Sequence, residues 1–345
     1  MKVLLLLFLT GCLYTQFVAQ AARGQLEIMG RARPIEEVVR DPETPLRTAM
    51  LLAEIPAIRE YGKSYGLTIT RNYKKYSDLG ERRPAAVWFV GGADPLQFRP
   101  VPWCFPIAGC FPGLGWFDED DAVAFKLQLD AQGLDAVVRP AGAFSTGGWF
   151  PDPVVSTMLG GGDSALPELA NVILHESVHA TAFVQDEQFF NESFANYVAD
   201  ALTENWVEQR FGPGSPEEVS WRLGQALNLP RVARQLATYK ALKAVYEDKT
   251  LTKAQKLARK AAIIDELMTD LHLRKRPNNA TINEVRLYNG GAEALRKAHR
   301  ACGDLRSLVL AGKRLRRDDF TKNTQEDLAP IGERLAQLCA QKLDR

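Results

Sequence analysis

The chain has 345 residues, of which 46% are hydrophobic and 25% are charged, which is the composition of a globular protein with a sizeable core. Its 43 lysines and arginines face 42 acidic residues, so no net charge attracts nucleic acid, and we expect no nucleic-acid partner. The length is enough for two ordinary domains or one large one.

The first residues have the pattern of a secretory signal. Lys2 is followed by an apolar run, Val3 to Leu9, and by small residues before Cys12. The run is far shorter than the roughly 20 residues that a membrane-spanning helix needs. We therefore expect residues 1–11 to be a signal peptide. It is either a lipoprotein signal, in which Cys12 is lipidated, or a plain cleaved signal that is followed by an incidental cysteine.

The segment Leu9-Thr10-Gly11-Cys12 also resembles the bacterial lipobox. The resemblance implies that Cys12 is lipidated and that the protein is anchored to a membrane on the periplasmic side of the cell envelope. Leu13 stands where an aspartate would favour retention in the inner membrane, so the resemblance favours the outer membrane. Two or more acyl chains anchor a protein stably.

The next elements are predicted from the spacing of apolar residues. Between residues 21 and 65 they recur at three and four positions, which is typical of helix. The short apolar run 85–90, ended by Gly91 and Gly92, predicts a strand. Residues 98–117 are rich in Pro, Gly and aromatic residues and predict an ordered loop. Residues 118–132, with acidic residues in the first turn, predict a helix.

Four cysteines besides Cys12 are an even number, which in an exported chain fits two disulfides. Cys104 and Cys110 are the natural local pair. Cys302 and Cys339 would join the ends of a C-terminal helical segment. Four reduced, buried thiols are the alternative.

The rest of the chain is predicted to change from mixed to helical structure. Residues 136–139 and 143–150 are expected to be strands, and a glycine break at 160–162 precedes a long helical region. Beyond the Phe211–Gly214 turn, almost everything to the C-terminus has helical periodicity. The sequence therefore predicts an α+β, predominantly helical fold.

The chemistry of the chain is concentrated in the segment His-Glu-Ser-Val-His, residues 175–179. On a helix the side chains of His175 and His179 lie on one face, so both imidazoles can bind one ion, and Glu176 projects beside them. Zinc takes such nitrogen ligands in tetrahedral geometry and leaves one position for water in catalytic sites. We expect Glu176 to be the general base that accepts the proton of that water.

A third protein ligand is expected further along the chain. A second helix that begins near Asn191, with Asn191 as its cap, would direct Glu192 in its first turn toward the ion. Only 12 residues separate His179 from Glu192, and this short gap leaves Asp186 and Glu187 as rival ligands.

The combination of His-Glu-x-x-His with Asn-Glu-x-Phe-Ala at 191–195 resembles the gluzincin metallopeptidases, which include thermolysin-like enzymes and the leucyl and alanyl aminopeptidases. The resemblance implies Glu192 as third zinc ligand. It also implies a zincin-like catalytic region with a small sheet over residues 12–211, followed by a helical C-terminal region, 212–345.

Three other segments resemble a bacterial family of predicted aminopeptidases: 103–110, 143–154 and, more loosely, 282–287. In zincin folds an edge strand upstream of the metal-binding helix pairs with extended substrate. Residues 143–150 lie in that place, and we expect Ser145, Thr146, Gly147 and Gly148 to contact substrate, with an ordinary strand and loop as the alternative.

Four residues are candidates for stabilising the transition-state oxyanion, and the sequence leaves the choice open: Arg286, Tyr239, Tyr246 and Tyr288. Arg286 is preferred because it lies in the loosely matching segment.

Two functions follow from these patterns. The first is a zinc-dependent peptidase of the cell envelope that acts on a peptide or protein substrate. The second is a zinc-binding lipoprotein without turnover, which would have no use for a carboxylate at position 176. The Gly-x-Met-Glu-Asn segment that binds the substrate amine in many aminopeptidases is absent, so the sequence does not predict removal of N-terminal residues.

Overall fold

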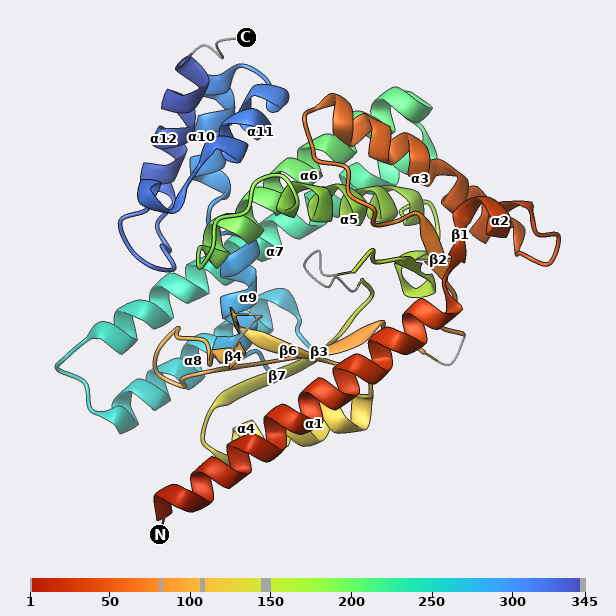
Figure 1. Ribbon diagram of the computed structural model, residues 1–345. Helices are drawn as coiled ribbons and strands as arrows, with labels where there is room; N and C mark the ends of the chain where they lie inside the picture. The colour runs from red at the N-terminus through yellow and green to blue at the C-terminus, as the bar shows by residue number, and fades with distance from the viewer. Residues whose placement is uncertain (1, 81–82, 106–108, 144–149, 342–345) are drawn as a thin grey trace.

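A computed structural model describes residues 2–80, 83–105, 109–143 and 150–341 (Figure 1). The α-helices are α1 (Lys2–Arg31), α2 (Ile35–Arg40), α3 (Leu46–Ser64), α4 (Glu119–Ala131), α5 (Ala165–His179), α6 (Gln188–Phe211), α7 (Pro216–Glu247), α8 (Lys253–Leu271), α9 (Asn279–Asn289), α10 (Ala292–Cys302), α11 (Leu305–Arg314) and α12 (Ala329–Ala340). Two short 3-10 helices are η1 (Ser156–Met158) and η2 (Arg317–Asp319).

The strands are short and form small sheets. They are β1 (Arg33–Pro34), β2 (Lys75–Ser77), β3 (Val87–Ala93), β4 (Trp103–Phe105), β5 (Gly109–Phe111), β6 (Gly113–Trp116), β7 (Asp135–Ala141) and β8 (Val154–Val155). The largest pairing is the antiparallel sheet β6-β3-β7. The others are β1-β2-β8, in which β2 and β8 run parallel, and the hairpin β4-β5. The prediction of an α+β, predominantly helical fold is confirmed.

The antiparallel sheet is covered on one face by α4 (Figure 1). Phe125 and Leu129 of α4 are buried against Val90 of β3 and Trp116 of β6. Asp118 caps the helix by accepting a hydrogen bond from the Asp121 backbone N–H at 3.1 Å, and three acidic residues follow in the first turn. Cap and acidic turn both stabilise a helix N-terminus, so this helix forms where the sequence predicts it.

Helices α5 and α6 pack against each other and form the centre of the molecule, with α3 on one side and α10, α11 and α12 on another (Figure 1). Their contact belongs to a continuous apolar core that runs from Ile28 to Leu338. The boundary expected at residues 211 and 212 falls at the end of α6, and this core extends across it.

The predicted helix over 21–65 is divided into the end of α1, α2 and α3. Pro34 and Pro45 immediately precede α2 and α3. Proline disfavours helical geometry in the residue before it, so each proline separates two helices. The apolar N-terminal run is the start of α1, and none of the helices in the described ranges is both long and apolar enough to cross a membrane.

The loop predicted over 98–117 contains three strands, and that prediction is wrong. Cys104 and Cys110 face each other in the β4-β5 hairpin and form a disulfide. Gly113 in β6 is needed for packing, because a Cβ there would lie 2.1 Å from the Phe89 ring. Gly113, one of the glycines on which the loop prediction depended, therefore allows close packing within a sheet.

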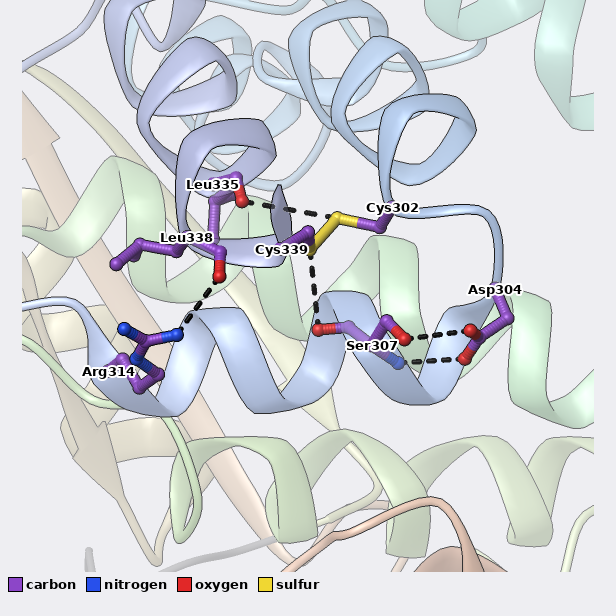
Figure 2. The surroundings of a disulfide bond; sticks show 7 residues. All are labelled: Cys302, Asp304, Ser307, Arg314, Leu335, Leu338 and Cys339. Carbon is purple, nitrogen blue, oxygen red and sulfur yellow. Dashed lines mark hydrogen bonds between the residues drawn. A yellow bond between two sulfur atoms is a disulfide. The ribbon is translucent and has the colours of Figure 1, made fainter. Parts of the chain in front are cut away.

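The second disulfide joins Cys302, the last residue of α10, to Cys339 in α12 (Figure 2). Between them, Asp304 caps α11 by accepting hydrogen bonds from the N–H and the hydroxyl of Ser307. Both disulfides in the structure are the pairs expected from the sequence.

Candidate metal centre and its surroundings

Helix α5 presents two imidazoles and a carboxylate near its C-terminal end. Leu169, Ile173, Leu174 and Val178 are fully buried and fix the other faces of the helix in the core. One turn apart, the rings of His175 and His179 lie with centroids 4.7 Å apart, nearly perpendicular to each other. This is the arrangement that the i, i+4 spacing predicts.

Glu192 of α6 completes the group. Its Oε2 lies 3.5 Å from Nε2 of His175 and 3.5 Å from Nε2 of His179, and the two Nε2 atoms are 3.1 Å apart. Ligands placed about 2.0–2.1 Å from a tetrahedral zinc ion lie about 3.3 Å from one another. The three atoms therefore fit the corners of one face of a zinc coordination tetrahedron.

The rival candidates Glu187 and Asp186 do not belong to this group. Glu187 is fully buried and accepts a hydrogen bond from the Gln325 N–H at 2.8 Å, with Arg317 at 3.1 Å from its second oxygen. The Asp186 carbonyl accepts a hydrogen bond from Thr324. Within the described ranges, His175, His179 and Glu192 are the only group of three or more His, Cys, Asp or Glu side chains close enough to hold an ion.

The helix that carries Glu192 begins earlier than predicted. α6 starts at Gln188, so Asn191 lies within its first turn and is not the N-cap. Its side-chain amide instead binds both the N–H and the carbonyl of Val184, at 2.9 and 2.8 Å. Asn191 thereby holds the loop between α5 and α6 in place, which fixes how the two helices present their ligands.

The charges of the three groups support each other. Burial alone would raise the pKa of Glu192, but the hydrogen bonds with His175 and His179 outweigh burial and hold that pKa well below its ordinary value. Burial alone would lower the pKa of His179, and Glu192 reverses the shift, so the pKa is raised. A carboxylate that is ionised over the whole neutral range is the state a metal ligand needs.

A further carboxyl group lies behind the histidines. Asp200, two turns after Glu192 on α6, accepts a hydrogen bond from the Asn171 amide at 2.9 Å. Burial raises the pKa of Asp200 to about 6, although Asn171 and the nearby His175 act in the opposite direction.

Two tyrosines from distant segments adjoin the site. The Tyr288 ring of α9 lies 6.2 Å from the His175 ring, centroid to centroid. Burial, together with the negative charges of Glu192 and Glu176, raises the Tyr288 pKa above its ordinary value. Burial and the charge of Glu176 likewise raise the pKa of Tyr73.

Tyr288 is one of the oxyanion candidates from the sequence, whereas Tyr73 is not. Tyr73 has a left-handed backbone, with φ of 61°, which is strained in a bulky residue. No local pattern around it marks a functional residue, because its place near Glu176 arises from tertiary structure alone.

Arg286 is placed among other partners. Its guanidinium lies between the rings of Phe189 and Tyr239, 4.2 and 4.6 Å from their centroids, and Nη2 is 2.8 Å from a Glu326 oxygen. These contacts do not include His175, His179, Glu192 or Glu176. The expected substrate residues Ser145, Thr146, Gly147 and Gly148 lie outside the described ranges, as does the side chain of Cys12.

Residues 16–326 match the family described as "Putative aminopeptidase". The chain belongs to this aminopeptidase family. The match includes all three grouped ligands, Glu176 and both tyrosines, and it ends before α12. No curated protein and no solved structure matches the chain.

For a member of this aminopeptidase family, the geometry offers the parts of a hydrolytic site. Three donor atoms from α5 and α6 lie within 4.8 Å of one another, Glu176 shares α5 with the two histidines, and a buried phenol adjoins them from α9. Two nitrogens and one carboxylate oxygen are a ligand set found in catalytic zinc sites, where the fourth position is kept open.

Proposed function

We propose that the protein is a zinc-dependent peptidase of the bacterial cell envelope, with Glu176 as general base. The observation that carries the proposal is the convergence of His175, His179 and Glu192 at 3.1 to 3.5 Å, the spacing of three ligands on one zinc ion. The aminopeptidase family favours a peptide substrate and cleavage near its N-terminus.

The donor set fits zinc rather than a harder cation. Calcium and magnesium prefer oxygen ligands only, whereas imidazole nitrogen suits zinc. Bound zinc supplies Lewis acidity, which lowers the pKa of water to about 7 and makes it a nucleophile at neutral pH.

Glu176 is the proton carrier in this mechanism. Its carboxylate accepts a proton from the attacking water and donates it to the amine that leaves, so the group is restored at the end of each cycle. It follows His175 directly on α5, so the helix that orients the ligand also orients the base.

Tyr288 takes the role of oxyanion donor in place of Arg286. A tyrosine hydroxyl is protonated at neutral pH, so Tyr288 can donate a hydrogen bond to the oxygen that gains negative charge. Its ring lies close to His175, whereas the guanidinium of Arg286 is held between Phe189 and Tyr239.

The envelope location is supported by two separate features. The lipobox-like segment that ends at Cys12 predicts export and lipid anchoring. The two disulfides fit an oxidising compartment such as the periplasm.

The test separates the ligands from the base. Glu192→Ala removes a charged ligand, so the purified variant is expected to lose zinc as well as peptidase activity. Glu176→Gln keeps the shape of the side chain and lies outside the ligand group, so it is expected to keep one zinc per chain. Because a general base contributes about 10²–10⁴-fold, this second variant should lose most of its turnover.

Zinc is measured by atomic emission and turnover with a peptide library. Asp186→Ala is the matched control, because Asp186 is the rival carboxylate in the loop before α6. If Glu176→Gln cleaves peptides as fast as the parent, the hydrolytic mechanism is wrong, and a zinc-binding lipoprotein without turnover replaces it.

A further inference from the structure

Two segments that lie far apart in the sequence share a composition without charge. Residues 12–22 and residues 100–117 contain no Asp, Glu, Lys or Arg, although 25% of the residues of the chain are charged. The first segment belongs to α1, and the second includes the β4-β5 hairpin and β6. In the structure these two segments contact each other.

Aromatic side chains join α1 to the disulfide-bonded hairpin. The ring of Phe105 in β4 lies 5.3 Å from the ring of Tyr14 and 5.4 Å from the ring of Phe17, centroid to centroid. On the hairpin itself, the same ring lies 6.1 Å from that of Phe111. These contacts make α1 and the hairpin one packed unit, with aromatic rings at its centre.

Part of this unit is exposed. Phe111 is 42% exposed, and Val18, one turn after Tyr14 on α1, is 53% exposed. Single exposed apolar residues are common on proteins, but these two border three half-buried aromatic rings in a region without charge. The hairpin surface is defined here as the exposed side of the unit formed by Tyr14, Phe17, Val18, Phe105 and Phe111.

The short distance from Cys12 to this surface indicates what covers it. Consecutive Cα atoms are 3.8 Å apart, so the backbone of Tyr14 lies within about 8 Å of that of Cys12. Helix α1 is fixed to the edge of β6 by Gln20, which donates to the Gly115 carbonyl at 3.1 Å and accepts from the Phe117 N–H at 3.0 Å. No flexible linker separates Cys12 from the fold, so a lipid on Cys12 brings the hairpin surface to the membrane.

We propose that the hairpin surface lies in the interfacial region of the phospholipid bilayer that holds the lipid on Cys12. The proposal rests on the lipid anchoring in the proposed function, and it adds the face that the protein turns toward the membrane. Aromatic side chains without neighbouring charges suit this region, because transfer of an apolar ring out of water is favourable and transfer of a charge is costly.

The hairpin surface assists the lipid and does not replace it. Phe111 and Val18 are each partly exposed, and together they bury far less apolar area in a bilayer than two acyl chains do. The lipid therefore provides the affinity, and the hairpin surface determines how the protein is oriented on the membrane.

The test attaches the protein to vesicles at Cys12 without depending on lipidation in the cell. Residues 12–345 are purified without lipid; of their five cysteines, the four besides Cys12 form the two disulfides. The Cys12 thiol is coupled to a maleimide-bearing phospholipid in phosphatidylcholine vesicles. Because this coupling works whether or not the natural chain is lipidated, failure of the surface and failure of the envelope location are distinguishable.

Phe111→Trp reports on the position of the hairpin. Phospholipids with brominated acyl chains quench a tryptophan only at close contact, and the emission of the parent is subtracted. We expect the added emission to fall by about half or more in brominated vesicles, because the ring lies at the boundary between headgroups and acyl chains. Absence of quenching overturns the proposal.

Met50→Trp is the matched control. Met50 is 63% exposed on α3, which Figure 1 shows well apart from the β4-β5 hairpin. Its added emission should be the same in brominated and ordinary vesicles. Equal quenching of the two variants would show that the protein has no preferred face on the bilayer, which contradicts the proposal.

A second variant tests the α1 side of the surface. Val18→Glu, combined with Phe111→Trp, places a charge in the surface and should reduce the quenching about twofold or more, because a carboxylate resists transfer out of water. If Phe111→Trp does not fold, as judged by circular dichroism, Val18→Trp is used as the reporter and should be quenched in its place. Absence of quenching in that variant likewise overturns the proposal.

A second copy of the chain is the competing occupant of the hairpin surface. In that case the emission of Phe111→Trp would change with protein concentration in the absence of vesicles and would not be quenched by brominated lipid, which overturns the proposal. Zinc content and turnover of soluble peptides should be those of the parent, because Phe111 lies outside the group of His175, His179 and Glu192. These two measurements separate the membrane-facing surface from the peptidase function.

Discussion

The hydroxyl groups of Tyr288 and Tyr73 both lie within electrostatic reach of Glu176, but their neighbourhoods differ. Tyr288 is also influenced by Glu192, and its ring is beside His175. The backbone of Tyr73 is tied to Asp152, whose carbonyl accepts a hydrogen bond from its N–H at 2.8 Å. The position of its ring beside His175, a proposed metal ligand, favours Tyr288 as the donor to substrate.

Tyr288→Phe removes one hydroxyl and leaves the ring. We expect kcat to fall about 10²–10³-fold with little change in KM, because the lost hydrogen bond forms mainly in the transition state. Zinc content should be that of the parent, since Tyr288 contributes no ligand atom. Steady-state kinetics on a neutral peptide and metal analysis check both statements.

Tyr61→Phe is the control for this variant. The Tyr61 hydroxyl is also buried, but it lies in α3 near Tyr65 and away from the grouped ligands. Its removal should leave kcat unchanged. Equal losses in the two variants would show that the effect of Tyr288→Phe is a general effect of removing a buried phenol.

At the scale of elements, α11 is held at both ends within the C-terminal helices. Asp304 caps its start, and Arg314 near its end donates to the Leu338 carbonyl of α12 at 2.9 Å (Figure 2). The disulfide between Cys302 and Cys339 closes the same group of helices and would stabilise it by about 3–4 kcal/mol for a loop of this length.

Asp304→Ala should destabilise the protein by about 1 kcal/mol at neutral pH, the usual effect of losing a helix cap. Hydrogen bonds from Ser307 hold the pKa of Asp304 below its ordinary value of 3.8. The ionised cap therefore stabilises the fold above that pH, and the contribution is lost as the pH falls through the lower folded-state pKa.

Urea denaturation at several pH values from 7 downward measures the difference between parent and variant. The difference should shrink as the solution becomes more acidic than pH 3.8. Asp304→Asn keeps a side-chain oxygen without a charge, so its stability relative to Asp304→Ala should not depend on pH. A constant difference between parent and Asp304→Ala would contradict the role of the charge.

Much of the candidate metal site was predictable because its signals are local. The two histidines share one helix face, and Glu192 follows in the next helix, so short spacings define all three ligands. The start of α6 was misplaced because Asn191 resembles a cap, whereas its amide binds the backbone of Val184 across the preceding loop. A contact that crosses a loop in this way leaves no pattern in the residues next to Asn191.

The elements that were mispredicted depend on distant partners. Strand β6 is glycine-rich because the Phe89 ring of β3 lies against it, and β8 exists only by pairing with β2, more than 70 residues earlier. Arg286 was expected at the oxyanion for its place in a family-like segment, but its aromatic neighbours come from α6 and α7. Tertiary contacts decide all three cases.

At the scale of the whole molecule, α1 connects the expected anchor to the folded core. The Gln20 side chain donates to the Gly115 carbonyl at 3.1 Å and accepts from the Phe117 N–H at 3.0 Å, so it pairs with the outer edge of β6. Tyr14 and Phe17 pack against Phe105 of the disulfide-bonded hairpin. Helix α1 therefore packs against the hairpin and the sheet from Tyr14 onward, two residues after Cys12.

This docking leads to a prediction about anchoring. If Cys12 carries the lipid, Cys12→Ser should move the protein from the membrane fraction to the soluble fraction, because the variant lacks the thiol to which an acyl chain would be attached. Residues 14–20 remain to hold α1 on the sheet, so the released protein should keep its zinc and its turnover of soluble peptides. Fractionation of cells followed by immunoblotting measures the first effect, and assays of the purified variant measure the second.

The control is Gln20→Ala, which weakens the docking of α1 and leaves Cys12 intact. It should stay in the membrane fraction, and its melting temperature should fall because two hydrogen bonds to the edge of β6 are lost. Unchanged fractionation of Cys12→Ser would mean that another part of the molecule binds the membrane. The exposed Phe111 of the β4-β5 hairpin, whose ring lies 6.1 Å from that of Phe105, would then be the first side chain to replace.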